Sequence, residues 1–295
     1  MAEIICYGSI AIDELLWLPR WPVPGDDLHP QAEAICLGGP ALNVALPLST
    51  WGHSVAVGGN CIGDDQYGRM IVERLTRLDL DWTALAVEPG RRTTICTLLI
   101  TPSGERTIIG RAFMEAAAGP LPSLEGARYL SLDLYGPGRR DAAQQAKAAG
   151  LNVIAGDIAS TDDPLVHLCD VIVLSADVLR AQQPERNPLD YAASLQAAGA
   201  RLVALTDGPR PATLLADNRM LKAQPPQLPI HDTTGAGDSF RAGLIHGLLS
   251  GWELERILAF AVAAGALRCT RAGGAEEPPP LVEVEALAMT VETWD

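Results

Sequence analysis

The chain lacks the features that mark several classes of protein. Its six cysteines stand far apart without a Cys-x-x-Cys pair, so neither a zinc site nor a disulfide framework is predicted. The longest apolar run, residues 257–267, is too short to span a bilayer. No basic segment precedes the apolar N-terminus, which Glu3 and Asp13 interrupt, so no secretory signal is predicted. These absences predict a cytoplasmic protein with buried, reduced cysteines.

Basic residues are also scarce. The sequence has 22 Lys and Arg against 36 Asp and Glu, which gives a formal net charge of −14. Nucleic acid and anionic membranes are poor partners for such a surface. The hydrophobic content of 48% is enough for a sizeable core, and no linker or internal repeat divides the chain. We therefore expect residues 1–295 to form a single domain.

Apolar runs and amphipathic stretches alternate along the sequence. Short β-branched or apolar runs predict buried strands over residues 3–7, 54–57, 151–155, 170–174 and 201–206. Helical periodicity predicts helices over residues 41–51, 66–78, 139–149, 189–198, 237–249 and 254–268. This alternation is typical of an α/β fold, and we expect a three-layer α/β/α sandwich around a mostly parallel sheet.

Two segments depart from this rhythm. Residues 12–37 and 91–110 have the pattern of extended chain, and the second contains the turn Pro102-Ser103-Gly104-Glu105 between two β-rich stretches. We predict that they form a small β-sheet lid over a crevice. The alternative is an additional hairpin at the edge of the main sheet.

The most informative stretch is Asp-Thr-Thr-Gly-Ala-Gly-Asp-Ser-Phe at residues 232–240, followed by an apolar-periodic helix. Gly235 and Gly237 let the backbone approach a ligand closely, and the free N–H groups of a helix start attract anions. Asp238 lies in the first turn, where a carboxylate can take a proton from an attacking hydroxyl. The alternative is that Thr234 and Asp238 only cap a helix.

The complete string resembles the C-terminal signature of the ribokinase (PfkB) family of carbohydrate kinases. The resemblance implies a ribokinase-like fold and ATP-dependent phosphoryl transfer to a hydroxyl of a small sugar, sugar acid or polyol. It also implies that Asp238 is the general base and that the amides of Gly235, Ala236 and Gly237 stabilise the transferred phosphoryl group.

A second motif agrees with this resemblance. Residues 38–45, Gly-Gly-Pro-Ala-Leu-Asn-Val-Ala, are similar to the family's N-terminal Gly-Gly-x-x-x-Asn-x-Ala. The resemblance implies that Gly39 and Asn43 contact the substrate, and an amide that both donates and accepts suits a polyol. Asp13 occupies the family position, just after the first strand, whose carboxylate binds substrate hydroxyls.

The nucleotide side follows the family less closely. Thr206 and Gly208 lie in a stretch similar to the family's Thr-x-Gly-x-x-Gly loop, but Pro211 replaces the last glycine and cannot donate an N–H. Residues 270–274 resemble the loop that follows the adenine-side helix. The resemblance implies that Thr206, Gly208, Thr234 and Gly273 contact ATP.

The metal side departs most clearly. Relatives carry Asn-x-x-Glu after the strand at 170–174, whereas this chain has Val178 at the glutamate position. Mg²⁺ keeps most of its waters and needs few protein ligands. Asp157 and Asp177 are the candidate substitutes, and the resemblance leaves open a monovalent cation such as K⁺.

The acceptor is less well defined by the sequence. Arg106 and Arg111 flank the second predicted lid strand, and an inward-facing Arg111 would favour an anionic acceptor such as a sugar acid. A nucleoside kinase shares every motif, and a non-catalytic ligand-binding protein of the same fold is the alternative that Val178 and Pro211 favour. No Gly-x-Gly-x-x-Gly follows a strand and no Walker A motif is present, which argues against a dehydrogenase or a P-loop enzyme. Lids of the family often pair across a homodimer.

Overall fold

A nine-stranded sheet forms the centre of the molecule in the computed structural model, which describes residues 1–133, 136–158, 160–274 and 276–295. The strands are ordered β15-β14-β13-β12-β11-β10-β9-β1-β4. All neighbours from β12 to β4 run parallel, and β13, β14 and β15 continue the sheet antiparallel. The prediction of a mostly parallel sheet is confirmed.

The strands of this sheet are β1 (Ile4–Gly8), β4 (Val55–Gly59), β9 (Tyr129–Leu132), β10 (Asn152–Gly156), β11 (Val171–Ser175), β12 (Leu202–Asp207), β13 (Arg210–Ala216), β14 (Arg219–Ala223) and β15 (Thr293–Trp294). Each of the five predicted strands is present and begins one residue later than predicted. The sequence interpretation missed β9, β13, β14 and β15.

The helices are α1 (Pro40–Thr50), α2 (Gln66–Leu75), α3 (Arg139–Ala148), α4 (Ala176–Gln182), α5 (Pro188–Ala197), α6 (Ala236–Leu249), α7 (Leu254–Arg268) and α8 (Leu281–Ala288), with short 3₁₀ turns at Phe113–Glu115 and Val166–Leu168. The six predicted helices are present. None of the helices in the described residues combines the length and apolar character that crossing a bilayer requires.

Two hydrophobic cores lie on opposite faces of the sheet. Successive residues of a strand point to opposite faces, so Ile4 and Cys6 of β1 enter one core and Ile5 and Tyr7 the other. The first core is completed by α1, α6 and α7, and the second by α3 and α5. This arrangement is the predicted three-layer α/β/α sandwich.

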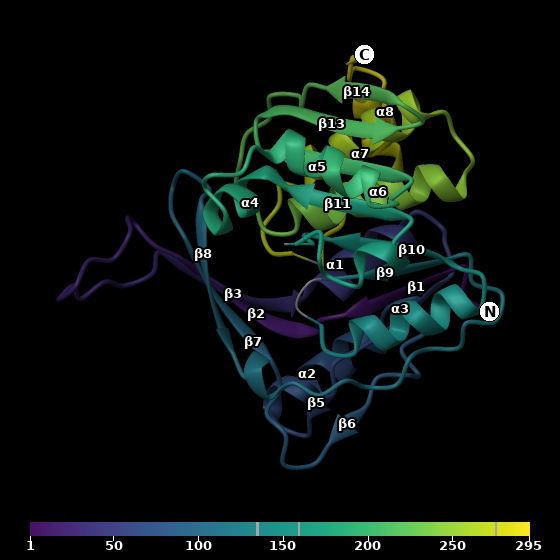
Figure 1. The fold of residues 1–295 in the computed structure, drawn as a ribbon. Helices are drawn as coiled ribbons and strands as arrows, with labels where there is room; N and C mark the ends of the chain where they lie inside the picture. The colour runs from purple at the N-terminus through teal and green to yellow at the C-terminus, as the bar shows by residue number, and fades with distance from the viewer. Residues whose placement is uncertain (134–135, 159, 275) are drawn as a thin grey trace.

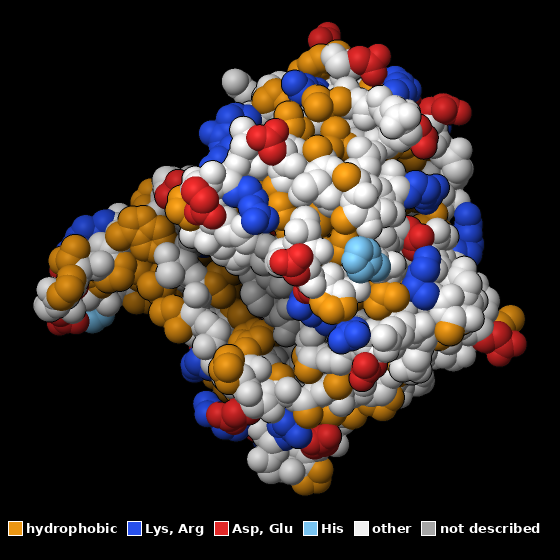
Figure 2. All heavy atoms as spheres, viewed as in Figure 1, with side chains coloured by type: hydrophobic (Ala, Val, Ile, Leu, Met, Phe, Trp, Pro, Cys, Tyr) orange, Lys and Arg blue, Asp and Glu red, His pale blue; other side chains and the backbone are white. Residues whose placement is uncertain are grey.

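A separate four-stranded sheet projects from the sandwich in the order β3-β2-β7-β8 (Figure 1). Its strands are β2 (Ala11–Trp17), β3 (Ala32–Gly38), β7 (Ile95–Ile100) and β8 (Arg106–Arg111), and a two-stranded sheet of β5 (Ile62–Gly63) and β6 (Val87–Glu88) lies below it. These four strands fall almost wholly within the two segments predicted as extended. The space-filling view shows the surface hollowed where this second sheet meets the body (Figure 2).

Candidate active site

The start of α6 contains the glycine-rich motif. Gly235 precedes the helix in a left-handed conformation with φ 74°, and no side chain caps the helix start. A Cβ at Gly235 would also come within 3.1 Å of the Gly274 carbonyl oxygen, so this position requires glycine for its conformation and for its packing. Ala236 and Gly237 form the first turn, and a Cβ at Gly237 would project into open space. The uncapped amides and the positive end of the helix dipole therefore suit an anion.

Asp238 follows in the same turn and is held at both carboxylate oxygens. Its Oδ1 accepts a hydrogen bond from Arg241 Nη2 at 2.9 Å, and its Oδ2 accepts one from Asn43 Nδ2 at 2.8 Å. The Asp238 side chain is 19% exposed, whereas that of Arg241 is 5% exposed. A partly open carboxylate beside uncapped amides can accept a proton while the amides stabilise an anion.

Asn43 reaches Asp238 because a diglycine turn sets the start of α1. Gly39 has φ 90°, and a Cβ there would come within 2.2 Å of the Ser9 carbonyl oxygen, so only glycine fits. Pro40 then begins the helix with the backbone angle that a first turn requires. The structure thus brings together two predicted residues that are 195 positions apart in the chain, and it gives Gly39 a steric role in their placement.

Asp13 lies on β2 and is 4% exposed. Burial, together with the nearby negative charges of Asp232 and Asp238, raises the pKa of its carboxyl to about 7. A Cβ at Gly38 would come within 2.1 Å of the Asp13 carboxyl carbon, so the diglycine turn also makes room for this side chain. Asp13 therefore belongs to the same electrostatic cluster as Asp238.

Asp232 hydrogen-bonds both Thr234 and Gly273, two of the predicted nucleotide contacts. It is fully buried, and its Oδ1 accepts hydrogen bonds from the Thr234 amide at 2.8 Å and the Thr234 hydroxyl at 2.6 Å. Its Oδ2 accepts one from the Gly273 amide at 2.9 Å. Buried Arg268 donates to the carbonyl oxygens of Thr234 and Gly273. The loops before α6 and after α7 therefore form one unit.

Four described residues in or beside this cluster have buried polar atoms without a hydrogen-bond partner: Ser9 Oγ, Asn43 Oδ1, Ser239 Oγ and Arg241 Nε. Buried polar atoms in folded proteins are normally paired, so such atoms mark places where a ligand or water would be bound. This concentration fits a site for hydroxyl and phosphate groups.

Thr206 and Gly208 lie where β12 ends and the chain turns into β13. The Thr206 hydroxyl donates to the Leu174 carbonyl oxygen at 3.2 Å, and Gly208 forms the turn between β12 and β13 with φ 55°. Arg210 and Arg180 both bond the intervening Asp207 and hold the pKa of its carboxyl well below the usual range. Pro211 falls within β13, so this segment is a tight hairpin.

The two candidate metal residues, Asp157 and Asp177, bond different partners. Asp157 Oδ1 accepts a hydrogen bond from the Ser175 amide at 2.8 Å, and burial raises the pKa of the Asp157 carboxyl. Asp177 is 64% exposed and pairs with Arg180 and Arg210. The described residues contain no group of three or more metal-ligating side chains. A Mg²⁺ ion that fits here would be held largely by phosphates and water, as is usual for this ion.

Arg111 lies on the face of the second sheet opposite Asp13. Across the sheet, Asp13 pairs with Cys96 and Cys96 pairs with Gly110, whereas Arg111 pairs with Ile95, the neighbour of Cys96. Because successive residues of a strand point to opposite faces, Arg111 and Asp13 are on different faces. Arg111 bonds Glu14, which Tyr67 also bonds, so the structure does not bring it to the Asp13 cluster.

Arg106 faces the other way. Arg106 and Arg111 are five positions apart on one strand, so they point to opposite faces and Arg106 lies on the same face as Asp13. Its guanidinium donates to Thr233 Oγ1 at 2.6 Å, and Thr233 donates to the Gly104 carbonyl oxygen at 3.3 Å. The turn of the β7–β8 hairpin therefore rests on the loop before α6.

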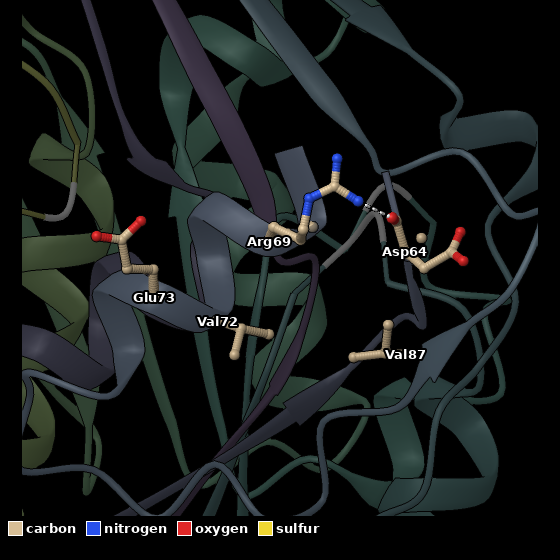
Figure 3. Close-up of a pocket in the computed structure, with 7 residues that line it drawn as sticks. Asp64, Arg69, Val72, Glu73 and Val87 are labelled. Atoms are coloured by element: carbon tan, nitrogen blue, oxygen red, sulfur yellow. Dashed lines mark hydrogen bonds between the residues drawn. The ribbon is translucent and has the colours of Figure 1, made fainter. Parts of the chain in front are cut away.

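A further surface hollow lies beside α2 and β6 (Figure 3). It is lined by Gly63, Asp64, Gly68, Arg69, Val72, Glu73 and Val87. Arg69 donates to the Asp64 backbone carbonyl at 2.5 Å, which turns its guanidinium along the rim. None of the predicted site residues lines this hollow.

Comparison with known proteins decides the family. The model of the pfkB family of carbohydrate kinases matches residues 1–280. The chain belongs to this family. It is 27% identical over 299 residues to acarbose 7(IV)-phosphotransferase of an Actinoplanes species, with 91% of this chain and 92% of the relative covered.

Solved structures give the same fold. A putative ribokinase from Agrobacterium tumefaciens superposes with a TM-score of 0.86 at 23% identity, over 98% of both chains. A putative ribokinase II from E. coli, solved in complex with ATP and Mg²⁺, superposes with a TM-score of 0.82 at 20% identity, over 98% of this chain and all of the other. The predicted membership of the ribokinase (PfkB) family and its fold are confirmed.

Sequence reasoning missed three residues of the candidate site. Asp232 was read only as the first letter of the motif, although an acid beside a turn often bonds the amide two residues on. Arg241 is 4% exposed and Arg268 is 0% exposed, whereas arginine side chains are normally solvated. Their buried role depends on partners distant in the sequence.

Proposed function

We propose that this pfkB kinase transfers the γ-phosphoryl group of ATP to a hydroxyl of a small sugar, sugar acid or polyol, with Asp238 as the general base. The observation that carries the proposal is the position of Asp238: its carboxylate lies beside an uncapped helix start and touches Asn43, the predicted substrate contact. Asp13 also supports it, because this carboxyl group lies within the same electrostatic cluster as Asp238.

The residues have four roles in this reaction. Asp238 takes the proton of the acceptor hydroxyl while the hydroxyl oxygen of the acceptor forms a bond to the γ-phosphorus. The bond from that phosphorus to the bridging oxygen of ADP breaks in the same step. The amides at Gly235, Ala236 and Gly237 stabilise the charge on the phosphoryl group. Mg²⁺, when bound with ATP, neutralises phosphate charge. Asn43 and Asp13 orient the acceptor, and Thr234 and Gly273 contact the nucleotide.

Several finer features belong to the same proposal. We infer a cytoplasmic protein, since all six cysteines are free thiols. We also infer a homodimer paired through the second sheet, where Ile35 is 44% and Ile109 50% exposed on one face. A K⁺ requirement would appear as stimulation of turnover by K⁺ over Na⁺.

The test is a coupled assay of ADP release over a panel of sugars, sugar acids, polyols and nucleosides. We expect turnover on at least one sugar derivative and its loss in Asp238→Asn. Turnover on nucleosides alone would instead favour a nucleoside kinase. Absence of turnover on every acceptor, or turnover that survives the substitution, contradicts the proposed mechanism.

The pKa of Asp13 predicts a pH dependence of acceptor binding. Its carboxyl has a raised pKa of about 7, so it is protonated below that pH and becomes a full acceptor of hydroxyl hydrogen bonds above it. We expect the KM for the acceptor to fall about tenfold between pH 6 and pH 8, as the ionised fraction rises. The measurement is the KM at fixed, saturating ATP.

Asp13→Asn is the control for this dependence, because the amide has no proton to lose in the range. The variant should bind the acceptor weakly, with a KM that stays flat over the same pH interval. A wild-type KM that does not fall with pH, or a variant that follows the wild-type profile, would exclude Asp13 as the titrating group.

A further inference from the structure

Arg241 lies one helical turn after Asp238 on α6, and its guanidinium joins that carboxylate to the central sheet. Nη2 donates to Asp238 Oδ1 at 2.9 Å, while Nη1 donates to the backbone carbonyl oxygen of Leu132 at 2.8 Å. Leu132 is the last residue of β9, at the carboxyl end of the parallel strands. The arginine therefore links the proposed base to a rigid part of the fold.

The surroundings of Arg241 are unusually acidic for a buried position. Burial raises the pKa of Asp133 and Asp157, and the positive charge of Arg241 lowers both. Neither of these carboxyl groups forms an ion pair of its own among the described residues, and Asp238 raises the pKa of both. Arg241 thus compensates a cluster of three acids. A buried charge of this kind contributes little net stability, so its value lies in what it orients.

The space occupied by the guanidinium is shaped for it. A Cβ at Gly156, the last residue of β10, would come within 2.6 Å of Arg241 Nη1 and 3.6 Å of its Cζ. The next nearest atom, the Val173 carbonyl oxygen, is 4.0 Å away. A methyl group at Gly156 would therefore press on the end of the Arg241 side chain and on little else.

The geometry points to Arg241 as a positioning residue for the proposed reaction: we propose that it fixes Oδ1 of Asp238, so that Oδ2, beside Asn43, faces the acceptor hydroxyl. This inference rests on the proposed function. A general base must direct one oxygen at the proton that it removes, and a carboxylate held at only one oxygen can turn away. The resemblance to the family does not supply this role, because Arg241 follows the end of the signature string.

The first test compares Arg241→Met and Arg241→Lys with the wild type. We expect Arg241→Met to lower kcat about 100-fold, as small misplacements of reacting groups do, with the KM values for ATP and acceptor changed less than about threefold. Arg241→Lys keeps the charge and one donor, so it should recover part of kcat, about tenfold over the Met variant. Circular dichroism and thermal unfolding establish that each variant is folded.

Gly156→Ala is the second test, because it displaces the guanidinium without deleting it and meets only a flexible side chain. We expect a lower kcat, in the same direction as Arg241→Met, with little change in KM. The matched control is Arg128→Met, since Arg128 likewise bonds a carboxylate, that of Glu3, and a backbone carbonyl, that of Leu249. Its kcat should equal that of the wild type.

Two results would overturn the inference. One is wild-type kcat in folded Arg241→Met; the other is a loss that Arg241→Lys does not reduce and that Gly156→Ala does not reproduce. For both results, the wild-type protein is the active reference and Asp238→Asn is the inactive reference. Failure of the proposed function is distinct, because it would appear as absence of ADP release by the wild-type protein.

Discussion

Asp238→Asn is expected to lower kcat by about 1,000-fold, while the KM for ATP changes little. The amide has nearly the same size as the carboxylate, but it cannot accept the proton of the acceptor hydroxyl. It also presents an NH₂ group to one of two donors, Arg241 Nη2 or Asn43 Nδ2, where the carboxylate now accepts from both. Steady-state assay of ADP release measures the effect, and calorimetric titration with ATP measures nucleotide binding separately.

The chain contains a closely matched control for this substitution at the start of α3. Gly138 precedes that helix with φ 75°, without a side-chain cap, and Asp141 stands three residues later, as Asp238 does after Gly235. Asp141 is exposed and belongs to no part of the proposed site. We expect Asp141→Asn to have wild-type kinetics. Equal losses in the two variants would mean that Asp238 matters only as an acid in a helix first turn.

The comparison of α3 with α6 also shows that a glycine followed three residues later by an aspartate is informative only together with a partner such as Asn43. Gly235 and Asp238 could be read from the sequence because glycine and acid at this spacing create an anion-attracting turn. Among the described residues, no side chain is seen to bond Asp141 as Asn43 bonds Asp238. Helix α7 was predicted with its correct bounds because its apolar run is too long for a strand, although Ile257–Ala264 are buried without a break and no single face is apolar.

The errors have physical causes as well. The segment that forms β13 was read as part of a nucleotide loop, because Gly208 and Pro209 signal a turn without revealing that a strand returns beside β12. Arg106 and Arg111 are separated by an odd number of positions, so at most one of them can share the face of Asp13. Which of them does so depends on the strand register, which the sequence did not supply. The single-domain prediction stays a prediction.

The role of Asp232 could not have been derived from spacing, because its partners come from two loops. The carboxylate binds Thr234 on one side and the Gly273 amide, 41 residues away, on the other. It also supplies negative charge near fully buried Arg268; burial lowers the pKa of that guanidinium, and Asp232 raises it. The acid thus holds together the two loops that are proposed to contact ATP.

Asp232→Ala is therefore expected to lower the free energy of unfolding by about 3–5 kcal/mol, because it removes the negative charge near buried Arg268 and leaves the buried amides of Thr234 and Gly273 without their acceptor. Urea unfolding followed by circular dichroism measures this change. Asp26→Ala is the control: Asp26 likewise accepts from a backbone amide, that of Val23, and has an arginine, Arg20, beside it, which it bonds directly, but at the surface, where such pairs contribute little. If the two variants were equally stable, Asp232 would not be the acid that joins the loops.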